Sequence, residues 1–222
     1  MELDAAMRTT FAARQYTGED LPDAVLYDIL ENARFAPSGG NRQGNRVVVV
    51  REQAAKDRLA ELAIPAAKRY AAQGKAGESP WNAVIPTKVP AAEIEATEPP
   101  AALTDPTRKA AVVLVFLVDL AVVASIDQNL DRVGVVSGAS IYPFVWNVLL
   151  QARQAGFGGT ITTLAIAQEA EIRKLLNVPE RFAVAAVMPL GKPVKQLTKL
   201  RRRRVEEIAV RERFDGPALA RL

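Results

Sequence analysis

The stretch Leu26–Gln43, LYDILENARFAPSGGNRQ, decides how the rest of the chain is interpreted. Its first half continues an amphipathic pattern that begins at residue 21, with apolar residues recurring at helical spacing. Pro37 ends that predicted helix, and the loop Ser38-Gly39-Gly40-Asn41 follows it. Glycines let the backbone approach a ligand closely, and Ser, Asn and Gln side chains supply directional hydrogen bonds. A plain helix–strand turn explains one glycine but not this polar series, so the stretch is a candidate binding loop.

Outward from this loop, apolar patterning predicts further helices and strands. Strands are expected at Val47–Val50, at 110–119, in the segment that begins at Gly156-Phe157-Gly158-Gly159, and at Phe182–Leu190. Helices are expected at 2–10, 21–35, 53–73, 90–96, 121–130, 138–155 and 168–177. This order has about four strands and lacks regular βαβ alternation, which predicts an α+β fold in one domain spanning residues 1–222.

The composition excludes several kinds of chemistry. The 222 residues contain no cysteine and no histidine, so disulfides, thiolate nucleophiles, cysteine-ligated clusters and Ser-His-Asp catalysis are impossible. A calcium-loop-like start at Asp127 has Arg132 at its sixth position and Gly138 at its twelfth, so no metal site is predicted. If the chain is an enzyme, its chemistry must come from the remaining polar side chains or from a bound cofactor.

Charge and hydropathy limit the expected partners. The 29 basic and 25 acidic residues give a net charge of +4, which makes phosphate ligands plausible. The run Arg201–Arg204 is a possible nucleic-acid patch, but no Trp or Tyr clusters with it in the sequence, so nucleic-acid binding is not expected. The most apolar run, 110–124, is short for a bilayer span and contains Asp119, so no membrane segment is expected. The lack of cysteine and of a secretory pattern favours a cytoplasmic location.

Three further segments indicate how the domain is elaborated. Residues 74–107 contain six prolines and are predicted to form a variable insertion or lid. Trp81 in this segment either stacks on a planar substrate or anchors the loop onto the core. The helix expected at 138–155 is apolar nearly all round, and the basic tail 191–222 has no core of its own. Both features predict a homodimer in which the tail wraps the partner.

Three blocks of sequence, taken in order, resemble the nitroreductase family of flavin mononucleotide (FMN) enzymes. The first block joins Arg8-Thr9-Thr10 and Arg14-Gln15-Tyr16 to Ala36–Gln43 and the valine strand. The second, Gly138–Gly159, is similar to the family's central dimer helix and the strand after it, and the third is the arginine run followed by Val205-Glu206-Glu207-Ile208. The resemblance covers nearly the whole chain except 74–107. It implies a three-layer fold with a central mixed, mostly antiparallel sheet flanked by helices, in a domain-swapped homodimer.

The resemblance also implies where FMN would bind. The implied contacts are Arg8, Thr9, Thr10 and Arg14 at the phosphate and part of the ring, Pro37, Ser38, Gly39, Asn41 and Gln43 from the partner subunit, Thr162, Thr163 and Leu164 near the flavin N5 and O4 edge, and Arg202 and Arg203 at the phosphate. The chain departs from many members at Gly44-Asn45, where they have Pro-Trp, and its first segment is spaced differently from their Arg-x-Ser-x-Arg motif.

The activity implied by the resemblance belongs to the flavin, and no catalytic side chain is assigned. NADH or NADPH would reduce FMN at N5, and a small electron-poor acceptor such as a nitroaromatic or a quinone would then be reduced in a ping-pong sequence. Two alternatives remain open: a flavin-consuming or dehalogenating member of the family, and a flavin-binding or storage protein without turnover.

Overall fold

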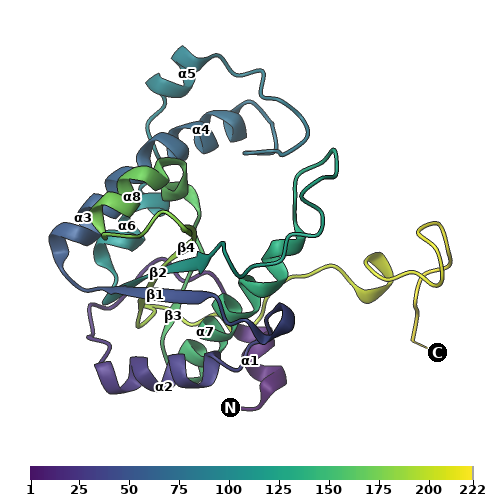
Figure 1. The fold of residues 1–222 in the computed structure, drawn as a ribbon, viewed down its shortest axis with the longest axis horizontal. Helices are drawn as coiled ribbons and strands as arrows, with labels where there is room; N and C mark the ends of the chain where they lie inside the picture. Colours follow the sequence, from purple (N-terminus) through teal and green to yellow (C-terminus); the bar gives the residue numbers. More distant parts are fainter. Residues whose placement is uncertain (222) are drawn as a thin grey trace.

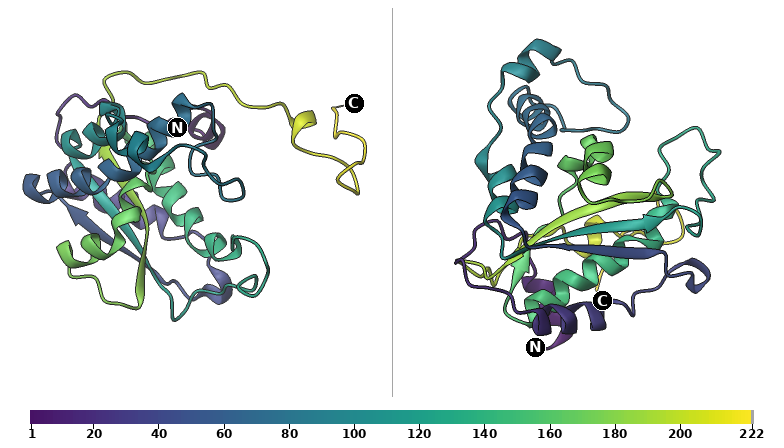
Figure 2. Two further views of the ribbon diagram at one scale, coloured as in Figure 1. Left: turned by 90° about the horizontal axis from the view of Figure 1, so that it is seen from above. Right: turned by 60° about the vertical axis from the view of Figure 1, so that its left-hand side comes forward.

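A four-stranded sheet lies between two layers of helices in the computed structural model, which describes residues 1–221 (Figure 1). One layer contains α1 (Leu3–Thr9), α2 (Asp23–Ala33) and α7 (Tyr142–Gln154). The other contains α3 (Gln53–Leu62), α6 (Ala101–Lys109) and α8 (Glu169–Leu175), and α4 (Ile64–Lys75) and α5 (Ala91–Ala96) extend away from the sheet on the same side (Figure 2). The predicted α+β class and its three layers are therefore confirmed.

The sheet order is β1-β2-β4-β3, and its neighbouring strands are all antiparallel. The strands are β1 (Asn45–Val50), β2 (Val112–Asp119), β3 (Gly158–Gly159) and β4 (Phe182–Gly191). An isolated parallel bridge joins Ala12 to Gly159 at the β3 edge. The sheet is thus mostly antiparallel with one parallel contact, and each predicted strand has a counterpart within a few residues.

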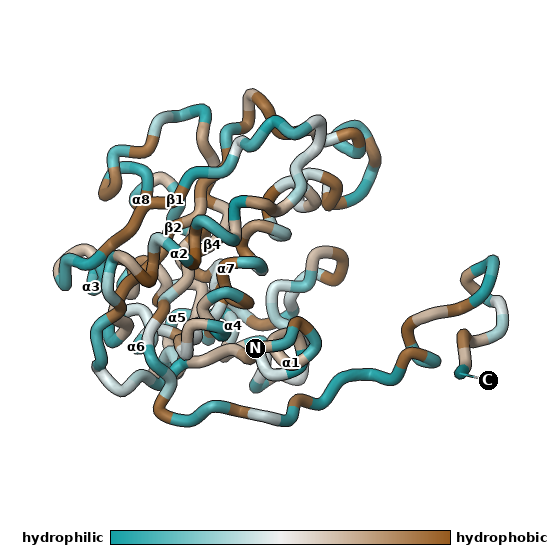
Figure 3. Tube along the Cα trace, turned by 90° about the horizontal axis from the view of Figure 1, so that it is seen from below, coloured by the Kyte–Doolittle hydropathy of each residue, from teal (hydrophilic) through white to brown (hydrophobic). Residues whose placement is uncertain are grey.

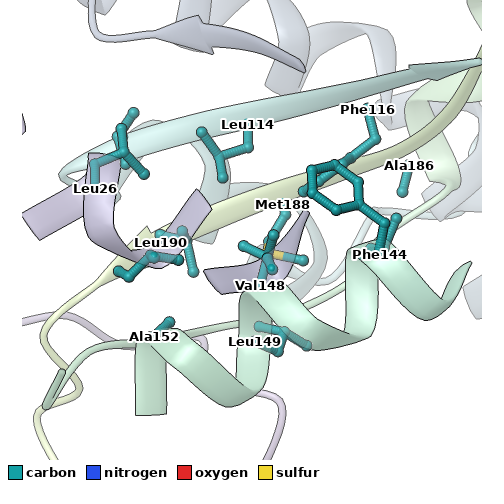
Figure 4. Packing of buried hydrophobic residues seen from close by; sticks show 14 of the residues in the cluster. Leu26, Leu114, Phe116, Phe144, Val148, Leu149, Ala152, Ala186, Met188 and Leu190 are labelled. Atoms are coloured by element: carbon teal, nitrogen blue, oxygen red, sulfur yellow. The ribbon is translucent and has the colours of Figure 1, made fainter. Parts of the chain in front are cut away.

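The central strand β2 is buried along its whole length because helices cover both faces of the sheet. Leu114 and Phe116 belong to the core on the α2 and α7 side, whereas Val113 and Val115 belong to the core on the α3 and α8 side. Figure 4 shows α7 lying along the first of these cores. There the rings of Phe116 and Phe144 pack edge to face, with their centroids 5.8 Å apart. This two-sided burial explains why the sequence of β2 reads as a continuous apolar run.

The helices near the middle of the chain differ from prediction at one proline. The helix expected at 53–73 is two helices that meet at Ala63, because Pro65 lies in the first turn of α4 and has no amide hydrogen to continue the bonding of α3. The helix expected at 138–155 begins at Tyr142 after a 3₁₀ turn (Val136–Ser140), with Pro143 in its first turn.

The helix predicted at 121–130 is wrong, because this segment forms an irregular loop between β2 and α7. Its acidic side chains accept hydrogen bonds from backbone amides, and these bonds compete with those of a helix. The Asp119 carboxylate accepts from the Ala121 amide at 3.0 Å, and the buried Asp127 carboxylate accepts from the Val135 amide at 2.7 Å and from the Arg132 guanidinium at 2.8 Å. The loop 120–136 is therefore organised around Asp127.

The segment 74–107 contains more regular structure than expected. The short helix predicted at 90–96 is present as α5, but α6 was not predicted because Pro100 and Pro106 argued against a helix. Pro100 precedes the first residue of α6, where a missing amide hydrogen has no consequence, and Pro106 is tolerated inside it. Within this segment, residues 76–90 and the short connection 97–100 lie outside the helices.

The tail leaves the body of the molecule after residue 197 and runs outward in extended form (Figures 1 and 3). Its residues alternate between hydrophobic and hydrophilic, and its regular structure is limited to a 3₁₀ turn at Val205–Glu207 and an isolated bridge between Val210 and Ala218. Phe214 is 98% exposed.

No helix within residues 1–221 has both the length and the apolarity that are required to cross a membrane.

Replacing Asp127 with Asn should open the loop 120–136 because the amide side chain loses the negative charge that holds Arg132 and the Val135 amide. Trypsin should then cleave after Arg132 several-fold faster in the variant than in the wild type. Asp131→Asn, which changes a neighbouring exposed carboxylate, is the matched control and should leave the rate unchanged. Equal rates for the two variants would contradict this account of the loop.

The same carboxylate makes the loop sensitive to acid. The Val135 amide first, and then Arg132 and the Val136 amide, lower the pKa of Asp127 from 3.8 to about 2. A depressed pKa means that the stabilisation is fully present above pH 3.8 and is lost as the pH falls through about 2. Pepsin cleavage of the loop should therefore rise across this window in the wild type, and the Asn variant should be cleaved throughout it.

Candidate functional site

Two adjoining cavities lie at the β3 edge of the sheet, and together we call them the edge site. The larger, of about 590 Å³, lies between residues 11–16, α6 and the chain after β4. The smaller, of about 180 Å³, lies between α4, α6 and residues 160–164. Arg14 and Ala102 line both cavities, which are therefore adjacent. The larger volume falls in the range of roughly 300–1,000 Å³ that is typical of small-molecule and cofactor sites.

The segment that carries Arg14 is fixed to the edge of the sheet by its backbone. The Ala13 amide donates to the Gly159 carbonyl oxygen at 2.9 Å, and the Ala13 side chain is fully buried. On the other side of Arg14, the Gln15 carbonyl accepts from the Val194 amide at 3.0 Å. Arg14 is thus held between two backbone contacts, and its side chain lines the edge site.

Two glycines allow close packing at this edge of the sheet. A Cβ on Gly159 would collide with the Pro189 carbonyl oxygen and would lie 2.6 Å from Cδ2 of Leu190. A Cβ on Gly191 would lie 2.8 Å from two ring carbons of Tyr16. The absence of a side chain at Gly159 therefore lets β3 lie close to β4, and its absence at Gly191 lets Tyr16 of the segment 11–16 pack directly on the end of β4.

Tyr16 completes the anchoring of this segment. Its hydroxyl lies 2.9 Å from the Ala13 carbonyl oxygen and 3.0 Å from the Pro189 carbonyl oxygen, so its single hydrogen is shared between two acceptors. Burial raises the pKa of the Tyr16 phenol, and the nearby Arg14 charge only partly opposes this. The hydroxyl therefore stays protonated and keeps its structural role as a donor.

Helix α6 forms the wall shared by the two cavities. Pro106 lies inside it and has no amide hydrogen to give to the carbonyl of Ala102, four residues earlier. Ala102 lines both cavities. The residue that borders both cavities, Ala102, therefore has a carbonyl oxygen that accepts no helical hydrogen bond from residue 106.

Positive charge is concentrated in the larger cavity. Arg14, Lys109 and Lys195 line it together with one acid, Asp105. The Asp105 carboxylate lies 2.6 Å from the Lys109 ammonium, so these two charges offset each other. Arg14 makes only a long contact of 3.4 Å to the Ala12 carbonyl. Within residues 1–221, neither Arg14 nor Lys195 forms an ion pair with a carboxylate, so both cations are available to an anionic ligand.

Thr162, Thr163 and Leu164, predicted to lie near a flavin edge, line the smaller cavity together with Arg14. Thr162 is held by a pair of backbone hydrogen bonds with Val187, each 2.9 Å long. Leu164 starts the 3₁₀ turn Leu164–Gln168. The structure therefore brings together the predicted residues 14 and 162–164, which are far apart in the sequence.

The other predicted residues of the first block lie outside the two cavities. Arg8 is exposed on the last turn of α1. The hydroxyls of Thr9 and Thr10 donate to the carbonyls of Ala5 and Ala6, and Thr9 also accepts from Arg153. Their polar groups are thus engaged in ending α1.

The predicted binding loop Pro37–Gln43 lies beside the start of α7, away from the edge site of its own chain. The Gly39 amide donates to the Ser140 hydroxyl at 2.9 Å, and the Gln43 amide donates to the Ser38 hydroxyl at 3.0 Å. Asn41 is exposed, with a positive φ of 53°. Arg202 and Arg203 lie in the extended tail and are also exposed. Neither cavity of the edge site is lined by the loop Pro37–Gln43 or by Arg202 and Arg203.

Trp81 lies outside the residues that line the edge site, and its contacts are those of an anchor. Its indole nitrogen donates to the Ala66 carbonyl at 3.2 Å, and its amide donates to the Gln73 side chain at 3.0 Å. The Arg69 guanidinium stacks over its ring at 4.2 Å. Within one chain, these contacts match the role of anchoring the loop onto the core rather than that of stacking on a planar substrate.

Sequence reasoning missed the contribution of α6 and of Lys195 to the site. Ala102 and Asp105 fall in the segment 74–107 that was predicted to be an insertion, Lys109 follows this segment, and no motif marks any of the three residues. The available signal was the helical spacing of Asp105 and Lys109, which places them on one face as an i,i+4 pair. Lys195 gave no signal, since it is one of many cations in a basic tail.

The fold and the edge site together define a three-layer α+β protein with a cation-lined ligand cavity at the sheet edge. The chain belongs to the nitroreductase family, because the model of that family matches residues 6–192. This range includes every residue that lines the smaller cavity and leaves out Lys195 and the rest of the tail.

Solved structures show the same fold at low sequence identity. The chain is similar to a BluB-like flavoprotein from Clostridium difficile, with 18% identity, a TM-score of 0.70, and coverage of 95% of this chain and 98% of that one. It is also similar to an iodotyrosine deiodinase bound to FMN and 3-iodo-L-tyrosine, with 19% identity, a TM-score of 0.67, and coverage of 96% and 99%. A third is an NADPH:FMN oxidoreductase from Vibrio harveyi complexed with NAD⁺, with 20% identity, a TM-score of 0.62, and coverage of 90% and 72%.

Replacing Gly159 with Ala should force β3 away from β4, because the new methyl group meets the Pro189 carbonyl oxygen and the Leu190 side chain. Overpacking of this kind costs about 1–3 kcal/mol of unfolding free energy, measurable by chemical denaturation. Gly74→Ala is the matched control, since a Cβ there meets nothing within 4 Å. It should be neutral or slightly stabilising in helix α4. Equal stability of the two variants would show that β3 and β4 are not tightly packed at Gly159.

Proposed function

We propose that the protein is an FMN-dependent oxidoreductase that takes electrons from NADH or NADPH and passes them to a small electron-poor acceptor. One observation carries the proposal: the edge site places Arg14 beside Thr162–Leu164, in a chain of the nitroreductase family. These are the residues for which the sequence resemblance implied contacts with FMN.

The chemistry of the edge site fits FMN. The larger cavity offers the cation Lys195 to a phosphate group, and Arg14 lies where the two cavities adjoin. The smaller cavity combines the hydroxyls of Thr162 and Thr163 with the apolar surfaces of Tyr70 and Leu164, which suits a ring with a polar edge and flat faces. The presence of both environments in adjoining cavities supports a ligand with an aromatic end and an anionic end.

When bound, FMN would supply the redox chemistry that a chain without cysteine or histidine lacks, by accepting hydride at N5 and passing electrons on. The protein's residues would bind and orient. Arg14, held on both sides by backbone contacts, would place its charge next to the negative charge that builds on the N1–O2 edge of the ring. Thr162, whose backbone is fixed by Val187, would line the ring-binding part of the site. No general base is required, because solvent can supply protons.

A second copy of the chain would complete the site. The loop Pro37–Gln43 and the arginines of the tail lie away from the edge site of their own chain, so they are free to reach that of a partner. The exposed Phe214 and the outward course of the tail support a homodimer in which each tail packs on the other subunit. On this proposal each of the two sites contains Arg14 from one chain and Asn41 from the other.

The function is tested by loading the purified protein with FMN and adding NADH or NADPH without oxygen. The visible flavin absorbance should bleach, and it should return when a nitroaromatic or a quinone is added. Bleaching without recovery by any acceptor, or no bleaching, would leave only a binding or storage role. Recovery by a halogenated phenol with release of halide, and by no other acceptor, would instead favour a dehalogenating enzyme.

The shared site is tested by mixing subunits. Arg14→Ala and Asn41→Ala should each bind FMN poorly as homodimers, because every site contains one altered residue. A hybrid dimer made by co-expression with two affinity tags should regain FMN binding at one of its two sites, where both wild-type residues meet. Wild-type FMN content in either parent, or no recovery in the hybrid, would contradict a site built from two chains.

A further inference from the structure

We infer that Lys56 and Arg108 form a second anion site, separate from the edge site, which binds a phosphate group. The site is a cavity of about 530 Å³ between the start of α3, the end of α6 and residues 16–20, and we call it the α3–α6 cavity. Tyr16 and Lys109 line both this cavity and the larger cavity of the edge site, so the two are neighbours. The inference does not depend on the proposed function.

Lys56 is the one cation that is buried within residues 1–221, with 7% of its surface exposed. The two buried carboxylates of the same part of the chain each have a counter-ion. Asp119 lies 3.1 Å from the Arg181 guanidinium, and Asp127 lies 2.8 Å from that of Arg132. Lys56 forms no ion pair with any described carboxylate. Because charged side chains are almost never buried without a partner, a counter-ion from outside the chain is expected here.

The Lys56 ammonium has hydrogen atoms left for such a ligand. It donates to the carbonyl oxygen of Ala110, at the end of α6, over 2.9 Å. An ammonium has three N–H donors, and no second acceptor among the described residues takes a hydrogen bond from this one. Lys56 lines the α3–α6 cavity, so an oxyanion bound there would accept from the remaining donors and neutralise the charge.

Arg108 brings a second free cation to the cavity. Its side chain is half-buried, and its guanidinium forms neither a hydrogen bond nor an ion pair within the part of the chain that the structure describes. The other charges that line the cavity already have partners: Lys109 lies 2.6 Å from Asp105, and Asp20 lies 3.5 Å from Arg51. A phosphate monoester carries a charge of roughly −1.5 to −2 at neutral pH, which two free cations match.

The two helix ends at the cavity add to its positive potential. The first turn of α3, which begins at Gln53, contains no acidic residue, and Glu52 before it makes no capping bond, so the first amides of α3 are left for a ligand. The end of α6 has the opposite polarity. Its carbonyls are bonded, however: Gln53 donates to the Arg108 carbonyl at 3.1 Å, and Lys56 donates to that of Ala110.

The bond from Lys56 to Ala110 also joins α3 to α6, so the test must separate anion binding from stability. The binding of inorganic phosphate is measured by calorimetry on Arg14→Ala, which lacks the cation shared by the two cavities of the edge site. Adding Lys56→Met should weaken phosphate binding by at least about tenfold, as expected for loss of a charge-assisted hydrogen bond. Lys56→Arg should retain most of the binding. Lys75→Met, at an exposed lysine in the last turn of α4, is the matched control and should change nothing.

Arg108→Met gives a second measurement that does not disturb the joint between the helices, because the Arg108 side chain makes no bond within residues 1–221. It should weaken phosphate binding several-fold and leave the melting temperature without phosphate unchanged. Phosphate should also raise the melting temperature of the protein that keeps Lys56 and Arg108, since a ligand of the folded state stabilises it. That rise should be lost in both Met variants.

Equal phosphate binding with and without Lys56 and Arg108 would overturn the inference. So would its replacement by chloride at equal concentration, which would show only a general attraction of anions to positive charge. Tighter binding of ADP than of phosphate, with the same dependence on Lys56, would support the inference and identify a nucleotide as the source of the phosphate group; equal affinities would support it with the free ion. Because Lys56→Met should bind FMN as the wild type does, absence of FMN binding in both would overturn the proposed function and leave this inference standing.

Discussion

The hydrogen bond from the Ala13 amide to the Gly159 carbonyl fixes the position of the edge site. It attaches the segment 11–16 to the end of the sheet, and the missing side chain at Gly191 lets Tyr16 of this segment pack closely on the end of β4. Arg14 on this segment, the Tyr16 hydroxyl and the chain leading to Lys195 are all located relative to that contact. Without it, the cavity would have no wall opposite α6.

Much of the fold was predictable because its signals are local. The valine-rich strands, the amphipathic α2 and the proline in the first turn of α7 all follow from the pattern of neighbouring residues. The loop 120–136 was not predictable in this way. Its apolar residues suggested a helix, but the Asp127 carboxylate binds amides eight and nine residues further along the chain, which no helical spacing contains.

The site was predictable only where a motif marks it. Arg14 and Thr162–Leu164 were identified by their resemblance to a family, and the structure brings them to one cavity. The contribution of α6 was missed because two prolines made its sequence resemble a loop, although one precedes the helix and the other is accommodated inside it. Lys195 gains its place from contacts of Val194 and Gln196 with residues 15 and 9, and such long-range contacts leave no trace in local sequence.

Arg14 lines both cavities of the edge site, and this sharing has a consequence for work with the protein in solution. A small anion such as sulfate that binds the Arg14 guanidinium in either cavity competes with any ligand that needs the same side chain in the other. By reciprocal linkage, a ligand that occupies Arg14 also weakens the binding of the anion by the same factor. The apparent affinity of the site for such a ligand therefore depends on the anion in the buffer.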